Sequence, residues 1–254
     1  MCSRCLATSF RPKTDPTMSK KIEARYERLL IPLFDDFEKK AVAAFESKAR
    51  ALAAPAVEID LDWLRAYLEK TIELTITKPA AGPQSKIVTT AYKQGITWAD
   101  TAIKAIGMDV KLGAGPIDRR ALDVLQSRNR SALTKLTYDL NAGIIDGLTE
   151  GLMQGEGITD LTKRVQNACQ AIGKTRAETI ARTETMYAVN QGTLIRYSQA
   201  GIARVKWLTG IDGAECVDCN ELHGQEFDID DVPDLPQHPR CRCTVTPVIQ
   251  TESI

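Results

Sequence analysis

Six side chains of the types that bind metal ions lie close together near the C-terminal end of the chain. Four of the seven cysteines and both histidines fall within 28 residues. They are Cys216, Cys219, His223, His238, Cys241 and Cys243. A Cys-x2-Cys turn directs two thiolates at one point, and the cysteines of a Cys-x-Cys strand face the same side. Together these residues can supply the four soft ligands of the tetrahedral site that zinc prefers.

The spacing leaves the ligand set open. The four cysteines form the simplest set. His238 can replace one cysteine of the second pair, because a His-x2-Cys spacing is also short, and His223 is a further alternative. Two disulfides, or a loop with free thiols, are the competing interpretations. Because the chain shows no secretory signal, clustered cysteines favour a metal over disulfides, and we expect structural zinc.

A catalytic role for this cluster is the less favoured interpretation. A catalytic zinc keeps one position open for water, whereas four cysteines close the site. A cysteine nucleophile would need a partner histidine, for which His223 and His238 are the candidates. The chain has no Walker loop and no His-Glu-x-x-His motif, and Gly113–Gly115 followed by Pro116 is too short for a dinucleotide fingerprint. We therefore expect no enzymatic activity.

Composition and charge limit the classes of protein further. Among 254 residues, 33 Lys and Arg balance 33 Asp and Glu, and 43% are hydrophobic. This composition is that of a globular protein and excludes wholesale disorder. The neutral balance argues against a generic nucleic-acid coat protein. Nine acidic and no basic residues lie between Thr209 and Pro239, which makes that loop a poor DNA-reading surface. The sequence contains no run of about 18 apolar residues, the length that a membrane-spanning helix needs, so no membrane span is predicted.

Helical periodicity covers most of the chain before the cysteine cluster. Apolar residues at three- and four-residue spacing predict a helix from Ser19 to about Leu52, with a kink or break at Pro32. A loop is expected at Lys78–Pro83. A second helix is predicted to start at Asp60, and a third to cover Gln84–Ile106. Two more are predicted within Ile117–Gln154. A further helix should end near Gly173, and the last should cover Lys174–Gly201.

Four glycines recur every fourth residue in the second half of Ile117–Gln154 and just beyond it. They are Gly143, Gly147, Gly151 and Gly155. A glycine inside a helix costs about 1 kcal/mol relative to alanine, so a stripe of them indicates that another backbone packs closely there. A contact face for a partner helix is the alternative.

After Gly201 the pattern changes, since Ala203–Leu208 alternates as a strand does. We therefore predict a mainly helical α+β protein: a flexible tail at 1–18, an elongated helical region at 19–156, and a small α+β module at 157–254 that a Cys/His cluster staples. In the tail, Cys2 and Cys5 are expected to be unpaired, with half a metal knuckle as the alternative. Met18 is a candidate natural start.

The C-terminal motifs resemble those of the phage Mu F-like minor head proteins, also called phage head morphogenesis proteins. That family combines an Ala-Arg-Thr-Glu helix, a Trp on the next strand, an Asp, Cys-x2-Cys, Leu-x-Gly and a final His-Pro-x-Cys-Arg-Cys before a proline. The matching positions are Ala181-Arg182-Thr183-Glu184, Trp207, Asp212, Cys216, Cys219, Leu222-His223-Gly224, His238-Pro239-Arg240-Cys241-Arg242-Cys243 and Pro247. The spaced combination is specific and covers about residues 150–250.

The resemblance implies a minor capsid protein of a tailed phage or prophage that is associated with the portal vertex. Its expected roles are head assembly and DNA packaging or delivery. Its expected partners are the portal protein, the major capsid or scaffolding protein and packaged DNA, with no membrane contact. Its expected places are the virion head and, during assembly, the host cytoplasm. Because the motif ends shortly before Ile254, we expect no additional C-terminal domain. A zinc-module DNA-binding or nuclease-like protein is the alternative, and a thiol-based enzyme is a third.

The charged residues of the motif are expected to act structurally or on a partner, as are Trp207 and Asp212. Arg182 and Glu184 lie two apart on a helix and point to different sides. One could anchor the acidic module and the other cap a loop, so Arg182→Ala should lower the melting temperature of the module. Arg240 and Arg242 flank the cysteines, where they could pair with the acidic loop, stabilise thiolates or, alternatively, contact phosphate.

Overall fold

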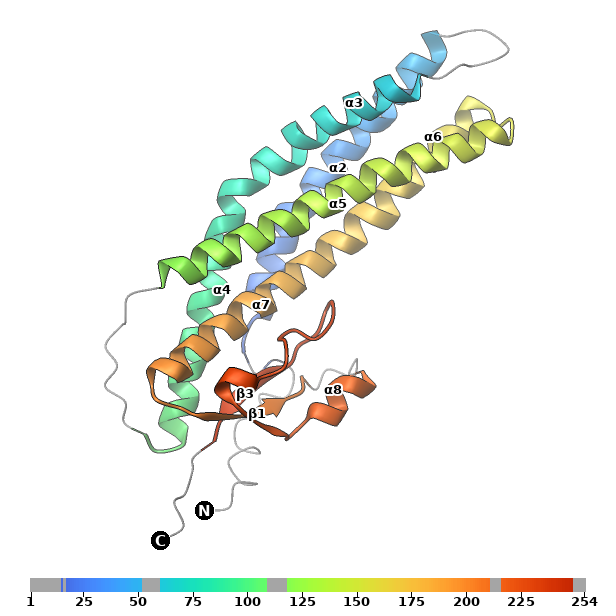
Figure 1. Ribbon diagram of the computed structural model, residues 1–254. Coiled ribbons are helices and arrows are strands. Elements are labelled where there is room, and N and C mark those ends of the chain that lie inside the picture. The colour runs from blue at the N-terminus through green and yellow to red at the C-terminus, as the bar shows by residue number, and fades with distance from the viewer. Residues whose placement is uncertain (1–14, 16, 52–59, 109–117, 211–215, 249–254) are drawn as a thin grey trace. The chain divides into compact units, whose positions relative to one another are not determined.

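The computed structural model describes residues 15, 17–51, 60–108, 118–210 and 216–248 (Figure 1). Its α-helices are α2 (Lys20–Ala51), α3 (Leu61–Ile72), α4 (Lys78–Ala105), α5 (Arg119–Met153), α6 (Ile158–Ala168), α7 (Thr175–Gln199) and α8 (Val217–Leu222). Two π-helical turns, η1 (Glu73–Thr77) and η2 (Cys169–Lys174), and one 3-10 turn, η3 (Ile229–Asp231), complete the helical elements. The strands are β1 (Arg204–Leu208), β2 (Glu226–Asp228) and β3 (Thr244–Pro247). None of the described helices combines the length with the apolar character that a membrane-spanning segment needs. The prediction of a mainly helical protein with a small sheet is confirmed.

The loop predicted at Lys78–Pro83 is wrong. The chain continues from α3 through the π-helical turn η1 directly into α4, and Pro83 lies inside that helix. Burial explains why the helix persists across two prolines: Ala80 and Gln84 are buried on its inner face, and Gln84 Nε2 donates a hydrogen bond to the carbonyl oxygen of Asn129 at 3.1 Å. Tertiary packing of this face outweighs the local cost of the missing amide donors.

Two other predicted breaks are absent, and a kink at Pro32 stays a prediction. Pro32 lies within the continuous helix α2, and α5 is a single helix where two were expected. A stripe of buried apolar residues runs along α5 and explains its continuity. The stripe consists of Leu125, Leu133, Leu136, Leu140, Ile144 and Leu148. Because the apolar stripe is buried along the whole helix, packing stabilises a continuous helix more than a break would.

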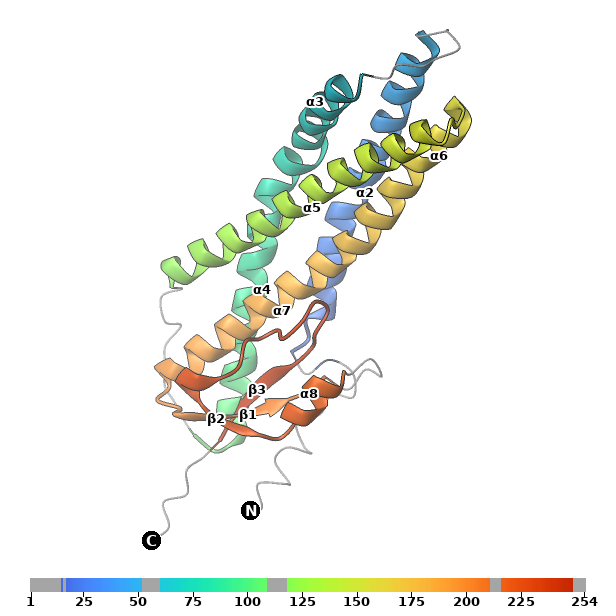
Figure 2. The same ribbon diagram turned by 45° about the vertical axis from the view of Figure 1, so that its right-hand side comes forward.

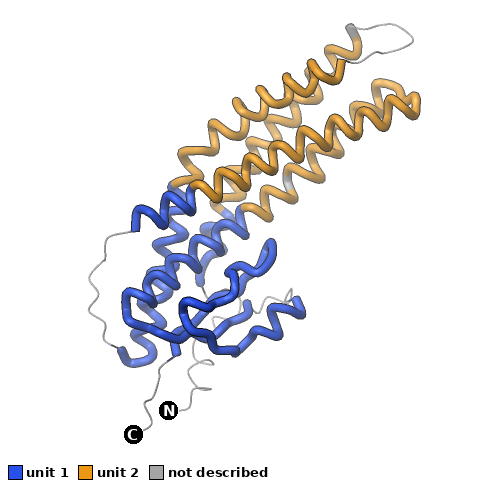
Figure 3. The backbone as a smooth tube through the Cα atoms, in the orientation of Figure 1, with its two compact units in different colours: residues 1–24, 86–126, 181–254 blue, residues 25–85, 127–180 orange. Residues whose placement is uncertain are grey.

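The chain forms two compact units, and each is assembled from segments far apart in sequence (Figure 3). Unit 1 contains residues 1–24, 86–126 and 181–254, and unit 2 contains residues 25–85 and 127–180. The units therefore do not follow sequence order, because α2, α4, α5 and α7 each contribute residues to both. The predicted division of the chain into a tail at 1–18, a helical region at 19–156 and a module at 157–254 stays a prediction.

Unit 2 is helical and has an apolar core with one buried polar network. The network joins three helices: Tyr26 Oη donates to Asn129 Oδ1 at 2.5 Å, and the Gln84 amide donates to the same side chain. Tyr26 on α2, Gln84 on α4 and Asn129 on α5 are at most 3% exposed. Because buried polar groups need partners, this network specifies which side chains of these helices face one another.

Unit 1 contains the sheet, in which β1 pairs antiparallel with β2 on one side and β3 on the other (Figure 2). The alternation predicted around β1 is confirmed, since Val205 and Trp207 are fully buried. The helices of this unit hold β3 through its backbone: Trp98 Nε1 and Tyr197 Oη each donate to the carbonyl oxygen of Val245 at 3.3 Å. The strand that follows the last two cysteines is thereby anchored to both α4 and α7.

A close helix contact in unit 1 involves two glycines outside the predicted stripe, Gly95 and Gly192. A Cβ atom on Gly192 would overlap the carbonyl oxygen of Tyr92, and one on Gly95 would overlap that of Val189. The helices α4 and α7 therefore touch backbone to backbone at this point. The predicted stripe differs, because a Cβ on Gly143 would meet the end of the Ile172 side chain at 2.5 Å, not a backbone.

Candidate metal centre

The six candidate ligands come from three short segments of unit 1. Cys216 precedes α8 and caps it, since the Cys219 amide donates to Cys216 Sγ at 3.3 Å. His238 lies in the loop after η3, and a turn links it to the last pair because the Cys241 amide donates to the His238 carbonyl oxygen at 3.2 Å. Cys243 is the residue immediately before β3. The anchored strand, the capped helix and the turn thus bring five of these side chains, all except His223, close together.

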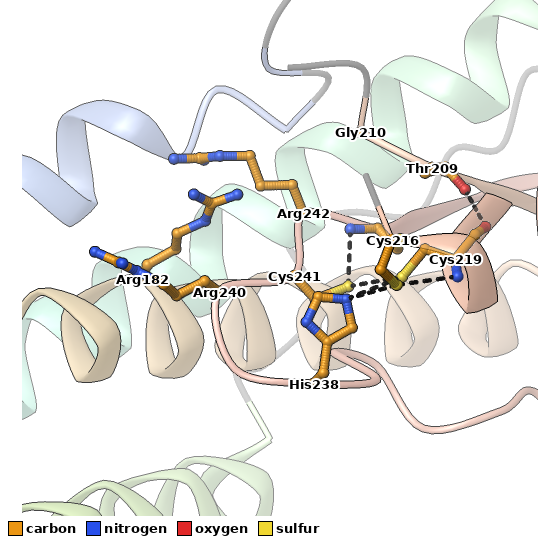
Figure 4. Close-up of a pocket in the computed structure, with 10 residues that line it drawn as sticks. Arg182, Thr209, Gly210, Cys216, Cys219, His238, Arg240, Cys241 and Arg242 are labelled. Carbon is orange, nitrogen blue, oxygen red and sulfur yellow. Dashed lines mark hydrogen bonds between the residues drawn. The ribbon is translucent and has the colours of Figure 1, made fainter. Parts of the chain in front are cut away.

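Four of the donor atoms form close pairs (Figure 4). His238 Nε2 lies 3.3 Å from Cys216 Sγ and 3.2 Å from Cys219 Sγ, and the sulfurs of Cys219 and Cys241 are 3.8 Å apart. Two sulfurs bound to one tetrahedral zinc at about 2.3 Å would also lie about 3.8 Å apart. The donor chemistry and spacing therefore fit a metal ion with soft ligands.

Two overlapping groups of three donors meet within 4.8 Å: Cys216, Cys219 and His238 form one, and Cys219, Cys241 and Cys243 form the other. Five donors are thus available for four tetrahedral positions. His223 is not in either group, and its Nδ1 instead accepts a hydrogen bond from the Thr209 amide at 3.1 Å. The geometry favours His238 over His223 as the histidine donor.

The thiols differ in how readily they ionise. A hydrogen bond from the Cys243 side chain lowers the pKa of Cys241 to about 5, although burial opposes this shift. The same interaction, together with burial, raises the pKa of Cys243. Burial raises the pKa of Cys219 to about 12. Hydrogen bonds from Cys219 also lower the pKa of Cys216. Because the thiolate is the form that binds metal, the lowered pKa values of Cys216 and Cys241 favour metal binding.

Hydrogen bonds from helix α7 fix the loop and the segment that carry the last donors. The Arg240 amide donates to Thr183 Oγ1 at 3.0 Å, and Asn190 Nδ2 donates to the Cys243 carbonyl oxygen at 2.9 Å. Arg240 has a φ of 67°, which for a residue other than glycine costs about 1–2 kcal/mol. Thr183 lies within the Ala-Arg-Thr-Glu motif, so the motif helix contacts the ligand loop directly. Asn190 carried no signal in the sequence.

The predicted supporting residues have different environments. Arg182, Arg240 and Arg242 line a pocket at the cysteine cluster together with Thr209 and Gly210. Two further members of the motif are buried: Trp207 is fully buried in the same apolar cluster as Cys219, Cys241 and Cys243, and Glu184 is 6% exposed. Asp212, Cys2 and Cys5 lie outside the described residues.

Arg242 pairs with a residue that the sequence analysis missed. Its guanidinium forms an ion pair with Glu23, which lies outside the acidic loop. Within that loop, Glu226 has Arg204 and Lys206 as salt-bridge partners on the neighbouring strand. Only folding brings Glu23 and Arg242 together, because 219 positions separate them in the sequence.

Comparison with known proteins agrees with the resemblance drawn from the motifs. The family model described as phage Mu protein F like protein matches residues 142–246, so this part of the chain is a phage Mu F-like region. An uncharacterized protein of Methanocaldococcus jannaschii is 27% identical over 134 residues, which are 52% of this chain and 21% of that protein. The match thus spans about a fifth of that relative's length. No solved structure matches at a significant level.

Proposed function

We propose that this phage Mu F-like chain is a minor capsid protein that acts in head morphogenesis of a tailed phage or prophage. The observation that carries the proposal is the extent of the family match. Residues 142–246 include the motif stretch around Thr183, the complete Cys/His cluster and the strand that anchors it. Within unit 1, the matching residues 181–246 therefore form a connected structure rather than a set of isolated motifs.

The metal centre that we propose for this region is structural zinc. Its candidate ligands are Cys216, Cys219, His238 and Cys241, and Cys243 is the fifth donor, buried at 1% exposure. When bound, zinc would cross-link α8, the loop around His238 and the segment before β3. A site with four protein ligands leaves no position for a reacting water, which supports a structural role without turnover.

At the level of the particle, we propose that the protein acts at the portal vertex, in head assembly and in DNA packaging or delivery. Its proposed partners are the portal protein, the major capsid or scaffolding protein and the packaged DNA. It would then be found in the virion head and, before assembly, in the host cytoplasm. The family resemblance supports these assignments.

Quantitative mass spectrometry of particles assembled from the portal and capsid genes of the source genome tests this function. We expect the chain in the particles at a fixed copy number far below that of the major capsid protein. Particles assembled without the portal gene are the control and should contain much less of it. Absence from mature particles and from assembly intermediates would contradict the proposal. In that case, salt-sensitive DNA binding or metal-dependent cleavage would favour the DNA-acting alternative.

A further inference from the structure

A buried ion pair connects the Cys-x-Cys segment to the start of α2. Arg242 Nη1 donates to Glu23 Oε1 at 2.7 Å, and Nη2 donates to Oε2 at 2.6 Å. The two side chains are 10% and 5% exposed, respectively. This bidentate geometry in a shielded place is the strong form of an arginine–carboxylate contact. Both residues belong to unit 1.

Glu23 is fixed at the first turn of α2 by further contacts. Ser19 Oγ donates to Glu23 Oε1 at 2.8 Å, and the Ser19 carbonyl oxygen accepts from the Glu23 amide at 3.0 Å. The neighbouring residue Thr17 is tied to α4, because Gln94 Nε2 donates to its carbonyl oxygen at 3.1 Å. The carboxylate therefore has a fixed position from which to hold Arg242.

Arg242 lies between two of the candidate metal ligands. Its side chain runs away from the sulfurs toward α2, whereas Cys241 faces the donor cluster (Figure 4). Gly210 packs against the backbone of Arg242, since a Cβ there would lie 2.7 Å from Arg242 Cβ and 3.0 Å from its carbonyl oxygen. The segment is thus held by its arginine on one side while its cysteines point to the other.

We propose that Glu23 and Arg242 are positioning residues of the metal centre, which hold Cys241 and Cys243 where a metal ion can bind them. This inference rests on the proposed metal site. Groups that orient metal ligands from outside typically change metal affinity 10- to 100-fold when removed. Because linkage is reciprocal, the bound metal also stabilises the ion pair and with it the start of α2.

The test is a cobalt(II) titration of the full chain with Glu23→Gln. Cobalt reports thiolate ligands by its absorption, and competition with a chromophoric chelator gives the affinity. We expect the variant to bind cobalt about 10-fold or more weakly than the wild type, with the same thiolate absorption bands. Arg242→Lys, which keeps the charge but not the bidentate contact, should lose affinity by a smaller factor. If Glu23→Gln does not fold, the cobalt affinity of Arg242→Lys still tests the inference.

The matched control is Asp100→Asn, which breaks the ion pair between Arg196 and Asp100 in the same unit. Its cobalt affinity should equal that of the wild type. The inference is overturned if Glu23→Gln and Arg242→Lys bind cobalt as tightly as the wild type, or if Asp100→Asn weakens binding equally. Failure of the wild-type chain to bind cobalt would instead refute the metal site itself, so the two failures are distinguishable.

A second readout is hydrogen exchange in the wild-type chain. Removing the metal with a chelator should speed exchange of the amides in the first turns of α2, near Glu23. In Glu23→Gln the same amides should already exchange faster with metal present. Unchanged exchange at the start of α2 on metal removal would contradict the reciprocal coupling.

Discussion

Cys219→Ser should abolish stoichiometric zinc binding and melt the region around the metal centre. Cys219 is 2% exposed and is the donor common to both groups of three, so among the described residues no group of three donors within 4.8 Å remains without it. Structural zinc contributes on the order of 10 kcal/mol to the folding of small metal-binding domains. We expect a loss of about 5 kcal/mol or more in unfolding free energy for this region. Zinc content by mass spectrometry and thermal melting with and without chelator measure both effects.

Cys169→Ser is the matched control for that substitution. Cys169 is likewise buried, and burial raises the pKa of its thiol to about 12, but it belongs to unit 2 and to neither donor group. It should retain the wild-type zinc content, even though a buried hydroxyl lowers stability. A Cys219→Ser protein that keeps one zinc per chain and the wild-type melting temperature would refute the assignment of Cys219 as a ligand.

Gly192→Ala should destabilise unit 1 by about 3 kcal/mol, at the upper end of the usual cost of overpacking. The added methyl group would overlap the Tyr92 carbonyl oxygen, which is backbone and cannot rotate away. The helices α4 and α7 would have to separate where Gly95 and Gly192 now let them touch. Urea unfolding followed by circular dichroism measures the change in free energy.

Gly147→Ala provides the comparison. The nearest atom to a Cβ at Gly147 is Arg164 Cβ, at 4.0 Å, so the methyl group fits. Removing a glycine from the interior of α5 should then increase stability by up to about 1 kcal/mol. Equal effects of the two substitutions would show that α4 and α7 are not in backbone contact. The comparison also tests whether the α4–α7 contact requires glycine at position 192 while the predicted stripe tolerates alanine at position 147.

The chemistry of the candidate site, and most of the secondary structure around it, could be predicted from the sequence alone. Cys216 and Cys219 lie on one turn, and His238 lies within five residues of Cys241 and Cys243. Within each of these two sequence clusters, the short spacing alone brings the side chains close together. The helical periodicity and the alternation around Trp207 are also local patterns, because they depend on which side of one element is apolar. The same local motifs supported the family resemblance.

The distant residues that support the site could not be predicted, because long-range packing brings them to it. His238 lies beside the cysteine sulfurs, whereas His223 Nδ1 accepts a hydrogen bond from the Thr209 amide and lies in neither donor group. The ion pair of Glu23 with Arg242 crosses 219 positions, and no local pattern encodes such a pairing.

The helix through Lys78–Pro83 and the contact at Gly192 were likewise settled by packing. Burial of a whole face supplies more free energy than local propensity opposes, and a close approach of two backbones depends on where both helices lie. Local sequence therefore determined the donors, whereas long-range packing determined what holds them in place.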